Sequence, residues 1–179
     1  MTDTRGPGRF AHGALFVALV AAMIFARLLP LGSVPRPVPG PDLILCLVIA
    51  WSIRRPDLLP VGLLVPVLLV SDLLLMRPPG LHTALLLAAS EALRQRHAAL
   101  QTLSIMGEIM LAGAISVAVI GGHWLVLAVL AVDQPALAVQ LLQAPINAAV
   151  YPAVMLACHA VFGLRKRPTL TGRALGAMR

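Results

Sequence analysis

The stretch from Pro41 to Arg96 constrains the fold most, because it holds three apolar segments that are separated by very short charged turns. The first turn reads Arg54-Arg55-Pro56-Asp57 and the second reads Arg77-Pro78-Pro79-Gly80-Leu81-His82. Lipid tolerates no exposed irregular backbone, so segments joined in this way are expected to cross a bilayer back and forth as helices. The sequence therefore predicts an all-α, polytopic membrane protein.

The composition supports this prediction. Of the 179 residues, 59% are hydrophobic and only 12% are charged, whereas about a quarter of the residues of a soluble domain are charged. The net charge of +7 would suggest a nucleic-acid partner in a soluble protein. Here the basic residues lie in turns and tails at the ends of apolar runs, which is typical of an orientation signal. We therefore expect no nucleic-acid partner.

Six spans are expected in a single transmembrane domain over residues 1–164, followed by a basic cytoplasmic tail over residues 165–179. Two spans are short for a hydrocarbon core that takes about 20 helical residues, and Pro66 predicts a bend in the third. The fifth is so long that it must tilt, protrude or break at Gly121-Gly122. The predicted spans cover about residues 10–31, 42–54, 58–76, 81–94, 103–132 and 136–164.

The distribution of Lys and Arg predicts the orientation. With the N-terminus inside, two basic residues fall on the outer side, Arg36 and Arg77, and Arg27 lies near the outer end of the first span. The positive-inside rule then places both termini in the cytoplasm. The cytoplasmic side receives Arg5, Arg9, Arg54, Arg55, Arg94, Arg96, Arg165, Lys166, Arg167, Arg173 and Arg179.

Small residues mark one face of the first span, where Ala14, Ala18, Ala22 and Ala26 recur every four positions. We expect this face to pack within the chain, and an interface with another protein is the alternative. Both cysteines fall inside apolar runs and are expected to be buried small residues.

No motif for catalysis, for a metal or for a phosphate loop is found in the sequence, so we expect neither an enzyme nor a cofactor. Ionisable groups at membrane depth are costly and become candidates by default. Near the outer face these are Asp42 and Asp72, for which internal pairing and recognition by a partner both stay open. An internal pair of Asp72 with Arg77 is slightly favoured, because the two lie five residues apart across a turn.

Two further polar groups are expected to have structural roles. Glu91 stands three residues before Arg94, so the two share a helix face and are expected to pair near the inner end. Asn147 lies between Pro145 and Pro152 in the last span. We expect its side chain to bond to backbone groups that these prolines leave free.

The order of several short motifs resembles the rod shape-determining membrane protein MreD family. They are Pro41-Asp42, Trp51 with Arg54-Arg55-Pro56, Asp72-Leu73-Leu74, Pro78-Pro79-Gly80-Leu81-His82, and a final Tyr151-Pro152 where the family more often has Trp-Pro. The likeness covers nearly the whole chain and names no catalytic residue. The interaction candidates that it supplies are Asp42, Trp51, Arg54, Arg55, Pro56, Asp72, Arg77, Gly80, His82, Tyr151 and Pro152.

The resemblance implies a scaffold in the bacterial inner membrane, embedded in lipid, which maintains rod cell shape. In that role the most direct partner would be MreC. The wider complex would hold MreB, RodZ, the peptidoglycan synthase RodA and its class B transpeptidase. Which helix face meets which partner, the oligomeric state and any bound lipid or small molecule stay open.

A transporter is the competing interpretation. MreD-like proteins are similar in architecture to the substrate-binding S components of energy-coupling factor vitamin transporters, which have six spans and dock through an Ala-x-x-x-Ala face on the first helix. The first span here has such a face. Against a transporter, the outer loops are short and lack the aromatic and polar residues that a vitamin pocket needs.

Overall fold

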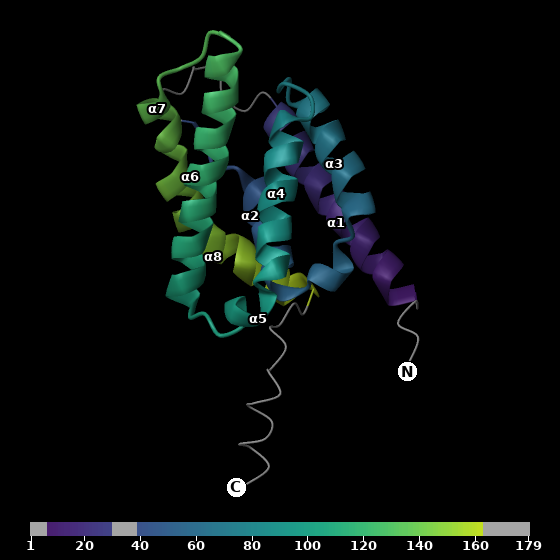
Figure 1. Ribbon diagram of the computed structural model, residues 1–179. Helices are drawn as coiled ribbons and strands as arrows, with labels where there is room; N and C mark the ends of the chain where they lie inside the picture. Colours follow the sequence, from purple (N-terminus) through teal and green to yellow (C-terminus); the bar gives the residue numbers. More distant parts are fainter. Residues whose placement is uncertain (1–6, 30–38, 163–179) are drawn as a thin grey trace, which may run out of the picture.

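The described part of the chain is all-helical, as predicted. A computed structural model describes residues 7–29 and 39–162, and no strand occurs in these two ranges (Figure 1). The predicted tail over 165–179 lies outside them. The helices are α1 (Pro7–Leu28), α2 (Leu43–Arg54), α3 (Val61–Leu74), α4 (Leu81–Gln95), α5 (His97–Leu100), α6 (Ile105–Val129), α7 (Leu137–Leu141) and α8 (Gln143–Phe162), with a 3-10 turn, η1 (Pro56–Leu58), before α3.

Helix α2 forms the centre of the bundle. Every residue from Ile44 to Arg54 is buried, because α1, α4, α6 and α8 all pack against this helix. A helix that is apolar all round is expected to be buried on all sides, and this one has only 12 residues. Asp42 begins it as the N-cap, where its side chain accepts a hydrogen bond of 3.2 Å from the backbone N–H of Leu45.

The packing face of α1 differs from the prediction. Phe16, Val20 and Ile24 point into the core, and they are 0%, 2% and 5% exposed. Ala14, Ala18 and the other two alanines of the predicted packing face lie two positions away, about 200° around the helix, and all four are exposed. The expectation that this face packs within the chain is wrong, because the larger side chains occupy the contact with the bundle.

Helices α3 and α4 begin at turn residues. The predicted third span starts later than expected, at Val61, because Pro60 precedes the helix as its N-cap and Leu58 belongs to η1. Helix α4 agrees with the prediction to within one residue and follows Gly80, which has a left-handed φ of 86°. Such a conformation strongly favours glycine.

The predicted fifth span forms one unbroken helix. Helix α6 runs through Gly121 and Gly122 for 25 residues, which corresponds to about 37 Å, and Ser104 caps its first turn. A break at the glycines is therefore excluded. A helix of this length in a core of about 30 Å has to tilt or protrude.

The described part of the predicted sixth span forms two helices. It is divided at Leu142 into α7 and α8. The physical reason is Pro145, whose ring would clash with the carbonyl of Leu141 in a continuous helix. Proline is tolerated in the first turn of a helix, where Pro145 lies in α8.

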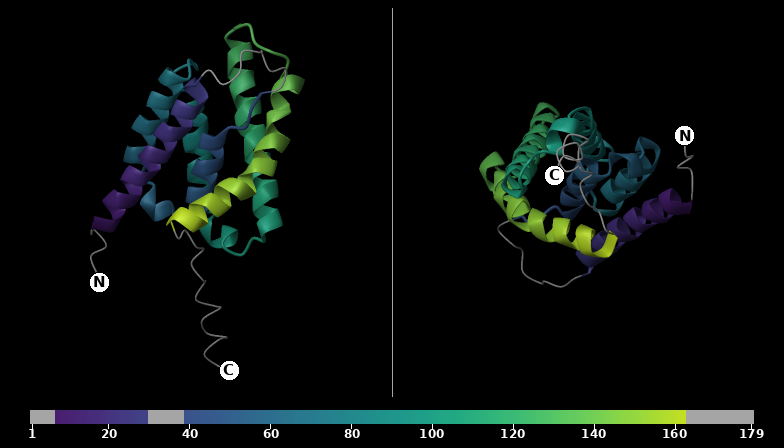
Figure 2. Two further views of the ribbon diagram at one scale, coloured as in Figure 1. Left: turned by 180° about the vertical axis from the view of Figure 1, so that it is seen from behind. Right: turned by 90° about the horizontal axis from the view of Figure 1, so that it is seen from below.

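The connections alternate between the two ends of the bundle. The start of α1, η1, α5 and the last turn of α8 lie at one end, and the α3–α4 turn and the α6–α7 connection lie at the other (Figures 1 and 2). We call the first the α5 end and the second the α7 end. Seen from below, α8 crosses the bundle toward α1 (Figure 2).

Three helical stretches are long and apolar enough to cross a membrane by length and composition. These are Ala11–Leu28, Ile105–Val129 and Leu137–His159, and Leu43–Arg54 and Val61–Leu74 are shorter apolar helices. Large apolar side chains are also exposed, among them Phe25, Met110 and Val129 at 67%, 66% and 78%. This surface indicates a membrane protein.

Candidate functional site

The family-motif residues gather in two polar clusters at the two ends of α2. Asp42, Arg77 and His82 form what we call the outer cluster. Arg54 and Tyr151 belong to a second group, the inner cluster, which also contains a residue of α6. Each cluster joins segments that are far apart in the sequence, so both hold helices together.

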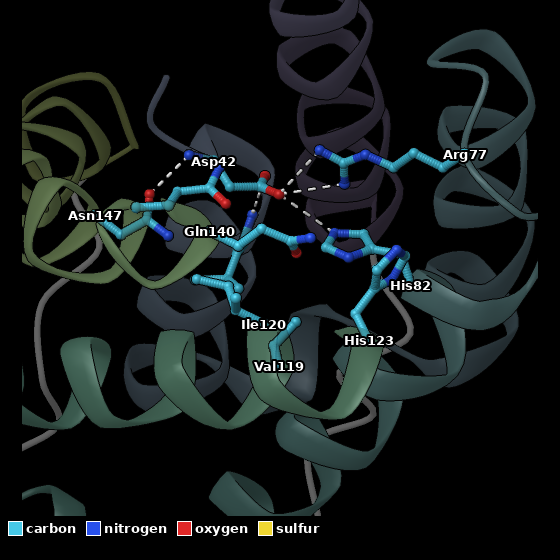
Figure 3. A pocket seen from close by; sticks show the side chains of 10 residues that line it. Asp42, Arg77, His82, Val119, Ile120, His123, Gln140 and Asn147 are labelled. Atoms are coloured by element: carbon cyan, nitrogen blue, oxygen red, sulfur yellow. Dashed lines mark hydrogen bonds and ion pairs between the residues drawn. The ribbon is translucent and has the colours of Figure 1, made fainter. Parts of the chain in front are cut away.

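The outer cluster is built on the Asp42 carboxylate. Its Oδ2 accepts hydrogen bonds from both terminal nitrogens of Arg77, each at 3.2 Å (Figure 3). His82 Nε2 lies 3.4 Å from the same oxygen. The side chains of Asp42 and His82 are 7% and 8% exposed and that of Arg77 is 21% exposed. A carboxylate this deeply buried needs such partners to offset its loss of hydration.

Asn147 fixes the outer cluster from α8, and its predicted role is wrong. Its Oδ1 accepts a 2.7 Å hydrogen bond from the backbone N–H of Asp42, and its Nδ2 donates to Ser116 Oγ at 3.2 Å. The side chain is fully buried. It thus joins α8 to the start of α2 and to α6, and does not bond to backbone that the prolines leave free.

A pocket of about 160 Å³ opens beside the outer cluster (Figure 3). Leu45, Val119 and Ile120 supply its apolar lining. Its polar lining consists of the outer cluster together with His123, Gln140, Gln143 and Asn147. The rings of His82 and His123 meet edge to face with centroids 6.4 Å apart, and His123 Nδ1 has no hydrogen-bond partner among the described residues.

Asp72 does not pair with Arg77, and the favoured expectation for this residue is wrong. Its Oδ2 accepts hydrogen bonds from the backbone N–H groups of Gly80 and Thr83, both at 3.1 Å, and from Thr83 Oγ1 at 2.7 Å. The turn folds back so that Asp72 binds the first turn of α4, and Arg77 is directed to Asp42 instead. Asp72 therefore shapes the turn that presents Arg77 and His82.

The inner cluster centres on Glu108 of α6, which the sequence interpretation missed. Its Oε2 lies 3.0 Å from Arg54 Nη1 and accepts a hydrogen bond of 3.2 Å from the Tyr151 hydroxyl. The Arg54 and Glu108 side chains are 8% and 1% exposed. One signal was available: Glu108 is a carboxylate within the predicted span 103–132, and ionisable groups at that depth are candidates by default.

The remaining motif residues lie around the inner cluster. Trp51 is fully buried, and its ring meets Phe16 of α1 edge to face with centroids 5.4 Å apart. The backbone N–H of Arg55 donates to the Trp51 carbonyl at 2.8 Å, and Pro56 starts η1. Pro152 lies inside α8 next to Tyr151. These residues end α2 and pack it against α1 and α8.

The expected pair of Glu91 with Arg94 is not formed. Glu91 is exposed, and Arg94 donates from its guanidinium to the Leu59 carbonyl, which ties α4 to the start of α3. Cys46 and Cys158 are both buried, as predicted. Within the described ranges, no group of three or more His, Cys, Asp or Glu side chains is placed to hold a metal ion.

Comparisons of the chain with models of known families, with curated proteins and with solved structures find no match.

Proposed function

We propose that this chain is a non-catalytic membrane scaffold of the bacterial elongation machinery, with the role that the resemblance to the MreD family implies. The observation that carries the proposal is that the motif residues make polar contacts between helices. Arg77 and His82 both contact the Asp42 carboxylate, and Arg54 and Tyr151 bond to Glu108. The motifs that carry the resemblance are thus the residues that fix the mutual placement of the helices, which is what a scaffold requires.

The proposed topology has six spans in the inner membrane, formed by α1, α2, α3, α4, α6 and the pair α7–α8. Helices α2, α3 and α4 have 12, 14 and 15 residues, about 18 to 22 Å, so a thinned bilayer or flanking charges must make up the remaining thickness. The alternating connections support this topology (Figure 1). The start of α1 and the last turn of α8 lie at the α5 end, together with Arg54 and Arg96, which we assign to the cytoplasm.

The proposed direct partner is MreC, within a complex that includes MreB, RodZ, RodA and the class B transpeptidase. The exposed alanine face of α1 supports an interaction through this helix, because small residues let another helix approach closely. The test is copurification of a tagged chain from membranes of the native host. We expect MreC in the eluate, and its absence beside a transporter ATPase module would contradict the proposal.

A second candidate function is the S component of a vitamin transporter, which the polar pocket favours. Such a pocket was not expected from the short outer loops, yet seven polar side chains line it. Its volume of about 160 Å³ is small beside the roughly 300–1,000 Å³ of typical ligand sites. An uptake assay with labelled riboflavin, biotin and thiamine distinguishes the two functions, because only the transporter predicts lost uptake on depletion.

A further inference from the structure

A groove of about 470 Å³ runs between α4 and α6, and no side chain of either polar cluster lines it. It exists because small side chains line it where the two helices face each other, among them Ala88 and Ala92 of α4 and Ala118 of α6. All three are exposed, and the buried side chain of Leu93 closes the groove on the side of the core. The lining is therefore apolar along most of its length.

The two ends of the groove differ in chemistry. At one end α4 and α6 come so close that a Cβ on Gly122 would lie 3.0 Å from Leu85 Cδ2, and Leu85 closes the groove there. At the other end Gln95 and Arg96 line it, and both are exposed. The groove is thus blocked near the start of α4 and open beside a guanidinium.

The length of the groove corresponds to that of one acyl chain. Leu85 and Arg96 are separated by 11 helical residues, which span about 16 Å. Half of a hydrocarbon core of about 30 Å is about 15 Å. The groove runs along most of the 15-residue helix α4 and is long enough for one acyl chain.

The charge at the open end is available to a ligand. Arg96 makes no side-chain hydrogen bond or ion pair with any described residue, while the neighbouring Arg94 donates to the Leu59 carbonyl. Glu91, on the same helix, does not line the groove. Basic groups beside grooves between helices on the cytoplasmic side attract anionic lipid headgroups.

We propose that the groove between α4 and α6 binds an acyl chain of an anionic phospholipid from the cytoplasmic leaflet, with its phosphate on Arg96. The assignment to that leaflet rests on the orientation given under the proposed function. The small alanine side chains leave room for the acyl chain, Leu85 limits how far the acyl chain extends along the groove, and Arg96 favours a negatively charged headgroup. Lipid bound there would cover the apolar lining that Ala88 and Ala92 leave open.

Native mass spectrometry of the full chain in detergent, titrated with phosphatidylglycerol or phosphatidylcholine, tests this site. We expect phosphatidylglycerol to bind about five-fold more tightly than phosphatidylcholine, which is the contribution of one arginine near a headgroup with a net negative charge. Arg96→Gln should bring the ratio to about one, and Arg96→Lys should keep it. An unchanged ratio in Arg96→Gln would overturn the role of Arg96.

Filling the groove provides the second test. If each new leucine excludes one methylene of the acyl chain, the double variant Ala88→Leu/Ala92→Leu should lower the affinity for both lipids about sixteen-fold, because each excluded methylene costs about four-fold. Ala128→Leu is the matched control, since Ala128 is exposed on α6 and does not line the groove. Unchanged lipid binding by the double variant would overturn the proposal. A dimer of the unchanged chain that the double variant dissociates would also overturn it, because the groove would then bind a second copy of the chain.

The outcome is independent of the scaffold function. In one outcome, MreC copurifies while Arg96→Gln and Ala88→Leu/Ala92→Leu bind phosphatidylglycerol as tightly as the unchanged chain does. That result contradicts the proposed lipid site and leaves the proposed scaffold function in place. If the lipid variants behave as expected and MreC does not copurify, the scaffold fails and the lipid site stands. The melting temperature of each variant shows whether it folds. If the double leucine variant does not fold, the comparison of the two lipids in Arg96→Gln tests the proposed site.

Discussion

Replacing Glu108 with Met tests the inner cluster most sharply. The change keeps the length of the side chain, removes the carboxylate and leaves the Arg54 guanidinium, whose side chain is 8% exposed, without its ion-pair partner at 3.0 Å. Breaking a buried ion pair in this way costs about 3–5 kcal/mol. For a domain of this size, that loss lowers the melting temperature by roughly 6 to 20 °C.

The measurement is thermal unfolding in detergent, followed by tryptophan fluorescence, since Trp51 is buried and stands three residues before Arg54 in α2. Glu91→Met is the control, because Glu91 is exposed and forms no ion pair with a described residue. The double variant Arg54→Met/Glu108→Met should be more stable than Glu108→Met, since no unpaired charge stays buried. A drop for Glu108→Met no larger than that for Glu91→Met would refute this reasoning.

Three further predictions concern the α7 end. Gly80→Ala should destabilise the chain by about 1–2 kcal/mol, since φ is 86° at this position. Gly121→Ala should not destabilise it, because an added Cβ meets nothing within 4 Å, and the melting temperatures of the two variants are compared. Asp42→Arg and Arg77→Asp should each reduce protein abundance on immunoblots, and the combined charge swap should recover part of the loss; no recovery would argue against this ion pair. A topology reporter at Pro79 should read periplasmic, and a cytoplasmic reading would contradict six spans.

The boundaries of α2 and α4 could be predicted from the sequence because their ends carry turn chemistry. Asp42 caps α2, and Gly80 takes the left-handed conformation that lets α4 begin at Leu81. Charged residues at both ends of these apolar runs restrict the positions at which the helices can begin and end. The break before α8 was also readable, since Pro145 removes a helical hydrogen bond and clashes one turn back.

The partners of the charged groups could not be predicted, because they depend on packing between segments that are distant in the sequence. Arg77 lies five residues from Asp72, yet it pairs with Asp42, which is 35 residues away. Glu108 pairs with Arg54 across 54 residues, and Asn147 bonds to Asp42 across 105. Nearness along the chain favoured Asp72, but the turn bends back and the Asp72 carboxylate binds α4 instead.

The face that α1 turns to the bundle was ambiguous for a different reason. The alanine face and the face of Phe16, Val20 and Ile24 both have helical spacing. In a chain surrounded by lipid, hydrophobicity does not distinguish the side that packs from the side that faces acyl chains. Only the shape of the neighbouring helices decides between the two.

Depletion of this chain in its native host is the most direct test of the scaffold function. Cell shape and vitamin uptake are measured in the same culture as the protein disappears. We expect rods to become swollen or round while uptake of riboflavin, biotin and thiamine stays normal. Unchanged rods with a defect in the uptake of one of these vitamins would contradict the scaffold and favour the transporter.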